Sequence, residues 1–239
     1  MVSKINEVIL IGGGLSINEG ISLGLKEKII DKCVFLTNYS YKHFSGTLLC
    51  FYDKDFYVPS YAKKEPNKYP DIYKELKNLP LIIGLKRNEG IEEFKLPNTI
   101  IIPCPKKELG NPLLVGIFTL AIAEIFEPKQ IFLLGFDWNR QPIPQDKTKY
   151  CPYSNLDIHY YKKEIQHRGL GWTGFYDNHN PDNYFKFFKD SKSKIYNVSL
   201  QSNINNFEKI DYTTFFNLLS DVVYNQEELR QELRKKLTT

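Results

Sequence analysis

The chain has 239 residues, 42% of them hydrophobic, which is enough to bury a sizeable core in one large domain or two small ones. Lys and Arg total 32 and Asp and Glu total 28, so the net charge of +4 is too small to indicate a nucleic-acid partner. The four cysteines lack the CxxC spacing of a zinc cage, so we expect free thiols in a reducing compartment.

The first half of the chain predicts short buried strands separated by helices. Residues 1–6 show no signal peptide and lead directly into EVILI, an apolar run typical of a strand buried on both faces. Ser16 is placed to cap a helix, with Glu19 close to a capping-box position. The predicted elements are strands at residues 7–11, 32–36, 47–52, 81–85 and 99–102, and helices at 17–28 and 71–78.

The second half contains the clearest helix–strand pair. Residues 112–126 are almost wholly apolar and predict a buried helix, and residues 129–134 predict the central strand that follows it. Residues 139–183 are rich in Tyr, Pro, Asn, Gln and Gly, hold three of the four histidines, and have the length of a lid-like insertion. A helix start at 184–189, a last strand at 193–198 and helices at 213–224 and 226–237 complete the prediction.

Alternating strands and helices predict an α/β fold: a Rossmann-like, mostly parallel sheet flanked by helices. We expect one domain at residues 1–225 and a charged C-terminal helix at 226–239. No apolar stretch approaches the roughly 20 residues of a membrane span, so we expect a cytoplasmic protein. The last helix has an apolar side marked by Leu229, Leu233 and Leu237. We expect this side to pack on the body or to self-associate. Peripheral contact with an anionic membrane is the alternative.

Three consecutive glycines, Gly12, Gly13 and Gly14, follow the first strand and are called the glycine loop below. Glycine lets the backbone approach a ligand, and the helix start after it offers free N–H groups and a positive dipole end, which suits phosphate or ribose. The loop is not a P-loop, and in a G-x-G-x-x-G pattern the third glycine would fall on Ile17. A tight strand–helix turn without a ligand is the alternative.

Polar residues follow several other predicted strands. In parallel α/β sheets ligands bind beyond the carboxyl ends of the strands, so Asn38, Asp53 and Asp137 join the glycine loop and Ser16 as candidate ligand-binding residues. Asn38 offers a donor and an acceptor to a base or sugar, or is a simple turn residue. Asp53 and Asp137 suit ribose hydroxyls or Mg²⁺; the alternatives are a solvated loop carboxylate and a turn cap.

The insertion supplies the candidate catalytic groups. His179 lies in a polar loop and can take a proton from an acceptor hydroxyl, although a surface histidine is the alternative. Tyr153, with Tyr150 and Tyr160, can hold a leaving phosphate through its hydroxyl. No histidine spacing supports a metal site, so none is predicted.

The strand ends also resemble those of two related groups. One is the Campylobacter-type bacterial sialyltransferases, and the other is the MptE-like group, similar to 6-hydroxymethylpterin diphosphokinases and including phage members. GGGLSI resembles their G-x-G-P-S-L loop. The segments that carry the rest of the resemblance are VFLTNYSY, CFYD, VGIFTLAIAEIFEPKQIFLLGFDW, FYDNHNPD and IYNVSLQSNINNF.

The resemblance implies a nucleotide lying across the strand ends, with Asn38, Asp53 and Gly116 among its contacts and His179 as the base. Val115 replaces the usual Ser of both groups, and Asp53 replaces the Asn of the sialyltransferases. An Asp at that strand end is familiar in the MptE-like group.

Three functions follow as hypotheses. The first is a sialyltransferase-like glycosyltransferase that moves a sugar from a nucleotide donor such as a CMP-sugar to a small-molecule or glycan hydroxyl, without metal. The second is a diphosphokinase or kinase that uses ATP and Mg²⁺ held by Asp53 and Asp137. The third is a non-enzymatic nucleotide-binding protein on the same fold.

Overall fold

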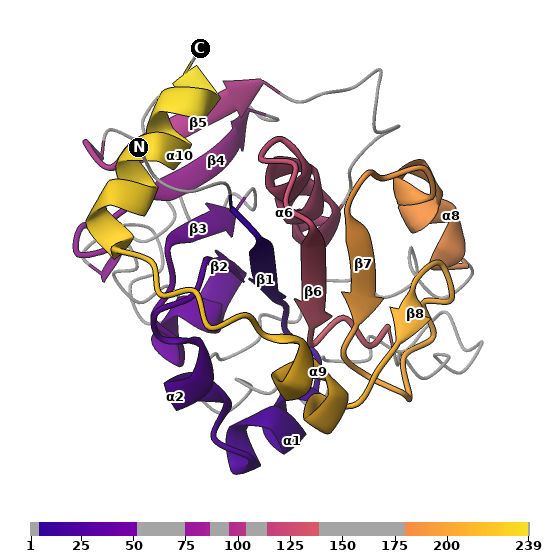
Figure 1. The fold of residues 1–239 in the computed structure, drawn as a ribbon. Helices are drawn as coiled ribbons and strands as arrows, with labels where there is room; N and C mark the ends of the chain where they lie inside the picture. Colours follow the sequence, from indigo (N-terminus) through magenta and orange to yellow (C-terminus); the bar gives the residue numbers. More distant parts are fainter. Residues whose placement is uncertain (1–4, 52–74, 87–95, 104–113, 139–179, 239) are drawn as a thin grey trace, which may run out of the picture.

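The computed structural model describes residues 5–51, 75–86, 96–103, 114–138 and 180–238. There, eight parallel strands form one sheet in the order β5-β4-β3-β2-β1-β6-β7-β8 (Figure 1), which confirms the predicted Rossmann-like α/β fold. The strands are β1 Glu7–Ile11, β2 Val34–Thr37, β3 Leu48–Phe51, β4 Ile82–Lys86, β5 Thr99–Pro103, β6 Gln130–Leu134, β7 Lys194–Asn197 and β8 Glu208–Lys209. The helices are α1 Ile17–Ser22, α2 Leu25–Ile29, η1 Asn38–Lys42, α6 Val115–Glu124, α8 Asp182–Phe185, η5 Lys186–Phe188, α9 Tyr212–Leu218 and α10 Gln226–Thr238.

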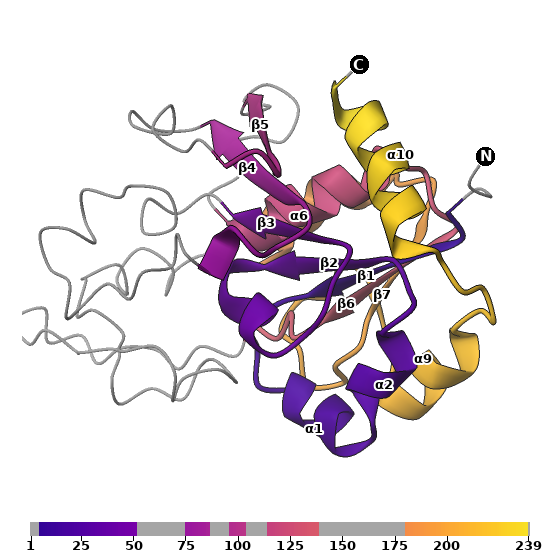
Figure 2. The ribbon, with the colours of Figure 1, turned by 90° about the vertical axis from the view of Figure 1, so that its left-hand side faces the viewer.

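Helices cover both faces of the sheet, so its central strands are buried on both sides. In β1, Val8 and Leu10 belong to one core cluster together with residues of α6 and α10, whereas Ile9 and Ile11 belong to a second cluster with residues of α1, α2 and α9. Figure 2 shows the two helix layers on opposite faces. This double burial explains why the first strand is apolar at nearly every position.

The prediction of one helix at residues 17–28 is wrong in one respect. The structure has two short helices there, α1 and α2. The chain breaks after α1 at Leu23 and Gly24, where Gly24 has a φ of +80° and is the N-cap of α2. Within α1, a Cβ on Gly20 would collide with the ring of Tyr212 from α9. Glycine at this position therefore lets α9 pack closely on α1.

The C-terminal helix packs on this chain's own body. Leu229 and Leu233 are fully buried in the α6 face of the core. Nε of Arg230 also donates to the carbonyl of Thr47 (3.1 Å), at the amino end of β3. The apolar side of the C-terminal helix therefore packs on the body of the protein, as expected. Among the described helices, none combines the length and the apolar character needed to cross a membrane.

The two cysteines in the described ranges, Cys33 and Cys50, are buried free thiols, as expected. Burial raises the pKa of Cys50 to about 12, and it raises the pKa of Cys33 as well. Both groups therefore stay protonated at neutral pH and belong to the core. Cys104 and Cys151 lie outside the described residues.

Candidate functional site

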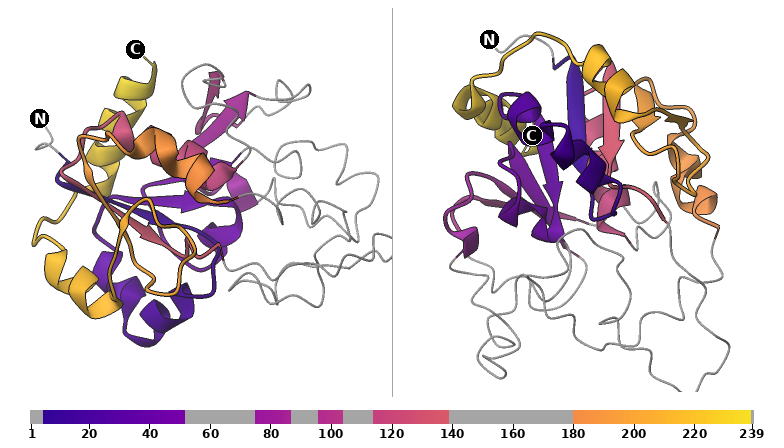
Figure 3. Two further views of the ribbon diagram at one scale, coloured as in Figure 1. Left: turned by 90° about the vertical axis from the view of Figure 1, so that its right-hand side faces the viewer. Right: turned by 90° about the horizontal axis from the view of Figure 1, so that it is seen from below.

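The strand order places its switch point between β1 and β6. The chain runs outward from β1 through β2 to β5 on one side, and from β6 through β7 to β8 on the other (Figure 3). Ile11 is in register with Leu134, so β1 and β6 end at the same level, and β2 ends at Thr37, one residue beyond Leu36, which is the partner of Ile11. Because neighbouring strands lie about 4.8 Å apart, the three ends span about 10 Å. Open α/β sheets bind ligands at this kind of position.

The glycine loop is hydrogen-bonded to the loop that follows β6, residues 135–138, called the β6 loop below. The Gly12 amide donates to the carbonyl of Leu134 (2.7 Å), and the Gly14 amide donates to the carbonyl of Gly135 (2.8 Å). A Cβ on Gly12 would lie 2.6 Å from the Gly135 oxygen, and a Cβ on Gly14 would collide with the Asp137 carboxylate. Glycine is needed here because the two loops touch.

Asp137 joins the same two loops through its side chain. Its Oδ2 accepts the Ser16 amide (2.8 Å), its Oδ1 accepts the Ser16 hydroxyl, and the residue is only 5% exposed. Ser16 is at the N-cap of α1, but it makes no side-chain cap bond there, so the predicted capping role of its hydroxyl is wrong. The Asp137 carboxylate instead stabilises the start of α1 from across the switch point.

These contacts change the expected role of the loop. Of the amides expected to hold phosphate or ribose, those of Gly12, Gly14 and Ser16 already donate within the chain. Asp137 also puts a carboxylate at the α1 start, where a phosphate would otherwise bind. In this structure the amides of Gly12, Gly14 and Ser16 are therefore not free to bind the predicted phosphate.

Asn38 lies at the end of β2, one strand away from the glycine loop. The Thr37 hydroxyl donates to the carbonyl of Ile11 (2.8 Å), which ties the end of β2 to the end of β1. The Ser40 hydroxyl donates to the Thr37 carbonyl (2.8 Å) and fixes the turn. Asn38 itself has a φ of +45°, a left-handed conformation that Asn tolerates better than most residues. The turn thus holds Asn38 beside the switch point.

Gly116 is brought to the same place by α6. A Cβ on Gly116 would lie 2.7 Å from Cε1 of Phe136 in the β6 loop. Its predicted contact with a nucleotide stays a prediction, and its visible role is to let the first turn of α6 approach Phe136. Phe136 is buried and in edge contact with Phe185 (ring centroids 6.5 Å apart).

The remaining predicted site residues, Asp53, Tyr153 and His179, lie outside the described residues, as does most of the insertion. Their roles stay predictions. Within the described ranges, no group of three or more His, Cys, Asp or Glu side chains is arranged to hold a metal ion.

Sequence reasoning missed the part that Asn197, Ser202 and Asn203 play at the site. The Asn197 side-chain amide and the Ser202 hydroxyl both donate to the carbonyl of Phe136, at 3.1 and 2.7 Å. Asn203 donates through its backbone amide to the carbonyl of Asp137 (2.8 Å). The available signal was the segment IYNVSLQSNINNF, which contains all three residues and is part of the resemblance, but the sequence shows no partner for its polar side chains.

Comparison of the chain with protein-family models, with curated proteins and with solved structures finds no match.

Proposed function

We propose that this protein is a nucleotide-dependent group transferase that moves a sugar from a nucleotide-activated donor to a hydroxyl acceptor. The observation that carries the proposal is the ending of β1, β2 and β6 within one residue of the same level at the switch point, with the glycine loop, Asn38 and Asp137 at these ends. This is where nucleotide-binding α/β sheets hold their ligands. The resemblance to the sialyltransferases supports the choice of chemistry.

The position of Asp137 suggests how the donor lies. A carboxylate that already accepts two bonds from Ser16 repels a phosphate at the start of α1, so we place the neutral, hydroxyl-bearing part of the donor there. The Asn38 amide is suited to a base or sugar edge on the neighbouring strand. The donor phosphate then faces away from Asp137, toward groups supplied by the insertion.

The proposed transfer step uses two residues of the insertion. His179 takes the proton of the acceptor hydroxyl, and the acceptor oxygen attacks the anomeric carbon of the donor sugar. The bond from this carbon to the phosphate oxygen breaks, and the nucleotide leaves with the electron pair. Tyr153 donates a hydrogen bond to the leaving phosphate.

The diphosphokinase alternative requires Asp137 to ligate Mg²⁺ together with Asp53. In the described structure each oxygen of Asp137 accepts one bond from Ser16 and keeps a second lone pair, so the metal dependence of nucleotide binding is what separates the two functions. Resident Mg²⁺ would serve the kinase chemistry by neutralising phosphate charge.

A ligand screen tests the proposal. CMP, UDP, GDP and ATP are each titrated calorimetrically into the full chain, with Mg²⁺ and with EDTA. We expect one nucleoside mono- or diphosphate to bind equally well under both conditions. Binding of ATP that EDTA abolishes would instead support the kinase, and no binding of any of the four would contradict a nucleotide site.

A further inference from the structure

The three residues that end the β6 loop are held by one short segment of the chain. The carbonyl of Phe136 accepts bonds from Asn197 and Ser202, as described above. The carbonyl of Asp137 accepts the Asn203 amide, and the carbonyl of Trp138 accepts the Asn203 side-chain amide (3.0 Å). Three consecutive carbonyls thus accept hydrogen bonds from Asn197, Ser202 and Asn203. We call these three donor residues the carbonyl clamp.

The clamp is rigid because its buried members also bond one another. Asn197 is fully buried and Ser202 is 3% exposed. Nδ2 of Asn197 donates to the Ser202 hydroxyl (2.9 Å), and the same hydroxyl accepts the Ile204 amide (3.1 Å). With its donation to Phe136, the Ser202 hydroxyl makes three hydrogen bonds, so one atom connects β7, the β6 loop and the turn that follows β7.

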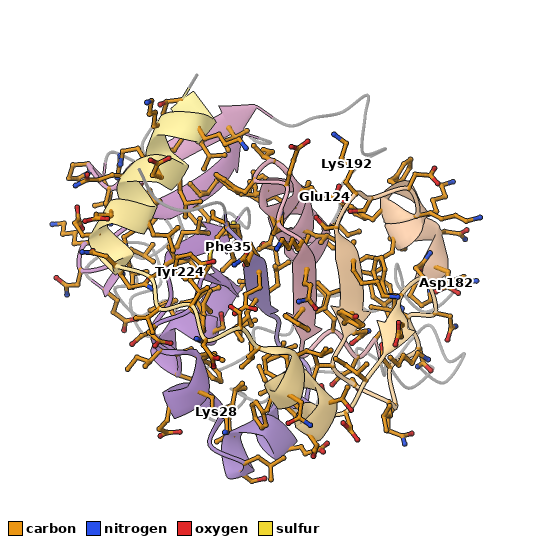
Figure 4. All side chains as sticks on the ribbon, viewed as in Figure 1. Lys28, Phe35, Glu124, Asp182, Lys192 and Tyr224 are labelled. Atoms are coloured by element: carbon orange, nitrogen blue, oxygen red, sulfur yellow. The ribbon has the colours of Figure 1, made fainter. Side chains whose placement is uncertain are left out.

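The residues that follow the clamp hold the start of α8. The Asn205 amide donates to Oδ1 of Asp182 (2.7 Å), and Nδ2 of Asn206 donates to the Asp182 carbonyl (3.1 Å). Asp182 lies beside β8 at the outer edge of the sheet (Figure 4). The ring of Trp138 also lies 5.5 Å from that of Tyr184 in α8. The segment from Asn203 to Asn206 therefore holds both Trp138 and the start of α8.

We propose that the carbonyl clamp is a positioning device for the candidate site, in which Ser202 and Asn203 act through Asp137 on the start of α1. The physical path is continuous: the clamp fixes the backbone of Phe136 and Asp137, and the Asp137 carboxylate fixes Ser16. The bond from the Asn203 amide to the carbonyl of Asp137 fixes the backbone position from which the carboxylate reaches Ser16. The predicted effect on nucleotide affinity rests on the proposed function, whereas the effect on Ser16 does not.

Ser202→Ala tests the clamp, with Ser193→Ala as its matched control. Ser193 is also a buried serine next to β7, and its hydroxyl donates to the carbonyl of Pro128 (2.6 Å), but at the amino end of the strand. Hydrogen exchange of the Gly14 and Ser16 amides is measured in both variants, with the Leu10 amide in β1 as reference. We expect exchange about tenfold faster at Gly14 and Ser16 in Ser202→Ala only, since a lost hydrogen bond changes an opening equilibrium by roughly that factor. Equal exchange in the two variants would overturn the proposal.

Asn203→Asp is a second variant that keeps the proposal testable if Ser202→Ala does not fold. Its side chain is exposed, and the change replaces the donor to the carbonyl of Trp138 with a charged carboxylate oxygen that repels this carbonyl. In a Trp172→Phe background, the emission of Trp138 reports on the loop. We expect a red shift relative to the parent, and an unchanged spectrum would overturn the role of Asn203.

CMP affinity is then measured in the same variants by calorimetry. Weaker binding in Ser202→Ala than in Ser193→Ala would support the link from clamp to ligand, and equal binding would overturn it. If the parent protein binds no CMP, that result counts against the donor proposed above, and the exchange and fluorescence measurements still decide the clamp.

Discussion

At the scale of single residues, the glycine loop shows where sequence reasoning succeeds and where it stops. The three glycines predicted either a ligand-binding loop or a tight turn after the first strand; the structure has the turn, and the close approach of its backbone is to the β6 loop. The partner was not predictable, because Asp137 lies 121 positions from Ser16 and no local pattern marks the pair. A carboxylate at a strand end suggests a ligand contact, whereas here it bonds the chain itself.

Asp137→Asn tests the internal role of this carboxylate. The amide can still accept the Ser16 amide at Oδ1 and donate from Nδ2 to the Ser16 hydroxyl, but both contacts lose the negative charge of the carboxylate that strengthens them. We expect the free energy of unfolding to fall by about 1–3 kcal/mol, measured by urea denaturation. Asp190→Asn, at an exposed position, is the control and should change it by less than about 0.5 kcal/mol. Equal effects would show that Asp137 is not an internal bridge.

His179→Ala tests the predicted base. Because the histidine is proposed to act on the acceptor and not on the donor, nucleotide affinity should stay within about twofold while the transfer rate falls by about 10²-fold or more. Calorimetry and product formation measure the two effects separately. A variant with undiminished turnover would exclude His179 as the base.

At the scale of elements, helix positions were predicted better than helix ends. A continuous apolar run located α6, and the leucine spacing marked the apolar side of α10, but the break between α1 and α2 was missed, because it depends on the left-handed φ of Gly24. The helix predicted at residues 213–224 runs from Tyr212 to Leu218, so its end is wrong, and Asp211 is its N-cap. Asp is a favoured N-cap residue, so this start was available from the sequence.

Asp211→Ala tests that cap through its pH dependence. The Asp211 carboxylate accepts the Thr214 amide (2.7 Å), and this backbone bond lowers the pKa of the carboxyl. A lowered pKa in the folded state means that the cap stabilises the protein above the usual Asp pKa of about 4 and loses its effect as the pH falls below it. We expect Asp211→Ala to lower the Tm by ~2–4 °C at pH 7, and the difference to shrink at pH 3. A difference that grows on acidification would contradict the assignment.

At the scale of the whole molecule, the alternation of buried strands and helices predicted the parallel sheet but not its order. Strand order depends on contacts such as Ile11 with Leu134, which are far apart in the chain. The edge strand β8 was missed because it has only two residues, Glu208 and Lys209, too few for a periodic pattern.

Leu233→Ala tests whether the C-terminal helix belongs to the folded body. Leu233 is fully buried against this chain's own core, so we expect a loss of about 2–4 kcal/mol in the free energy of unfolding, with no dependence on protein concentration. Leu237, which is only partly buried at the same face, is the control and should cost less when changed to Ala. Stability that rises with protein concentration would instead favour self-association through this helix.

The central claim is that a nucleotide binds where β1, β2 and β6 end. Its most direct test is amide chemical-shift mapping of the ¹⁵N-labelled full chain during titration with CMP, UDP, GDP and ATP. The account predicts that at least one nucleotide shifts the amides of Gly13, Asn38 and Trp138 together, while those of α10 at the opposite end of the strands stay unchanged. Shifts confined to α10 and the amino ends of the strands, or no shifts with any of the four, would contradict it.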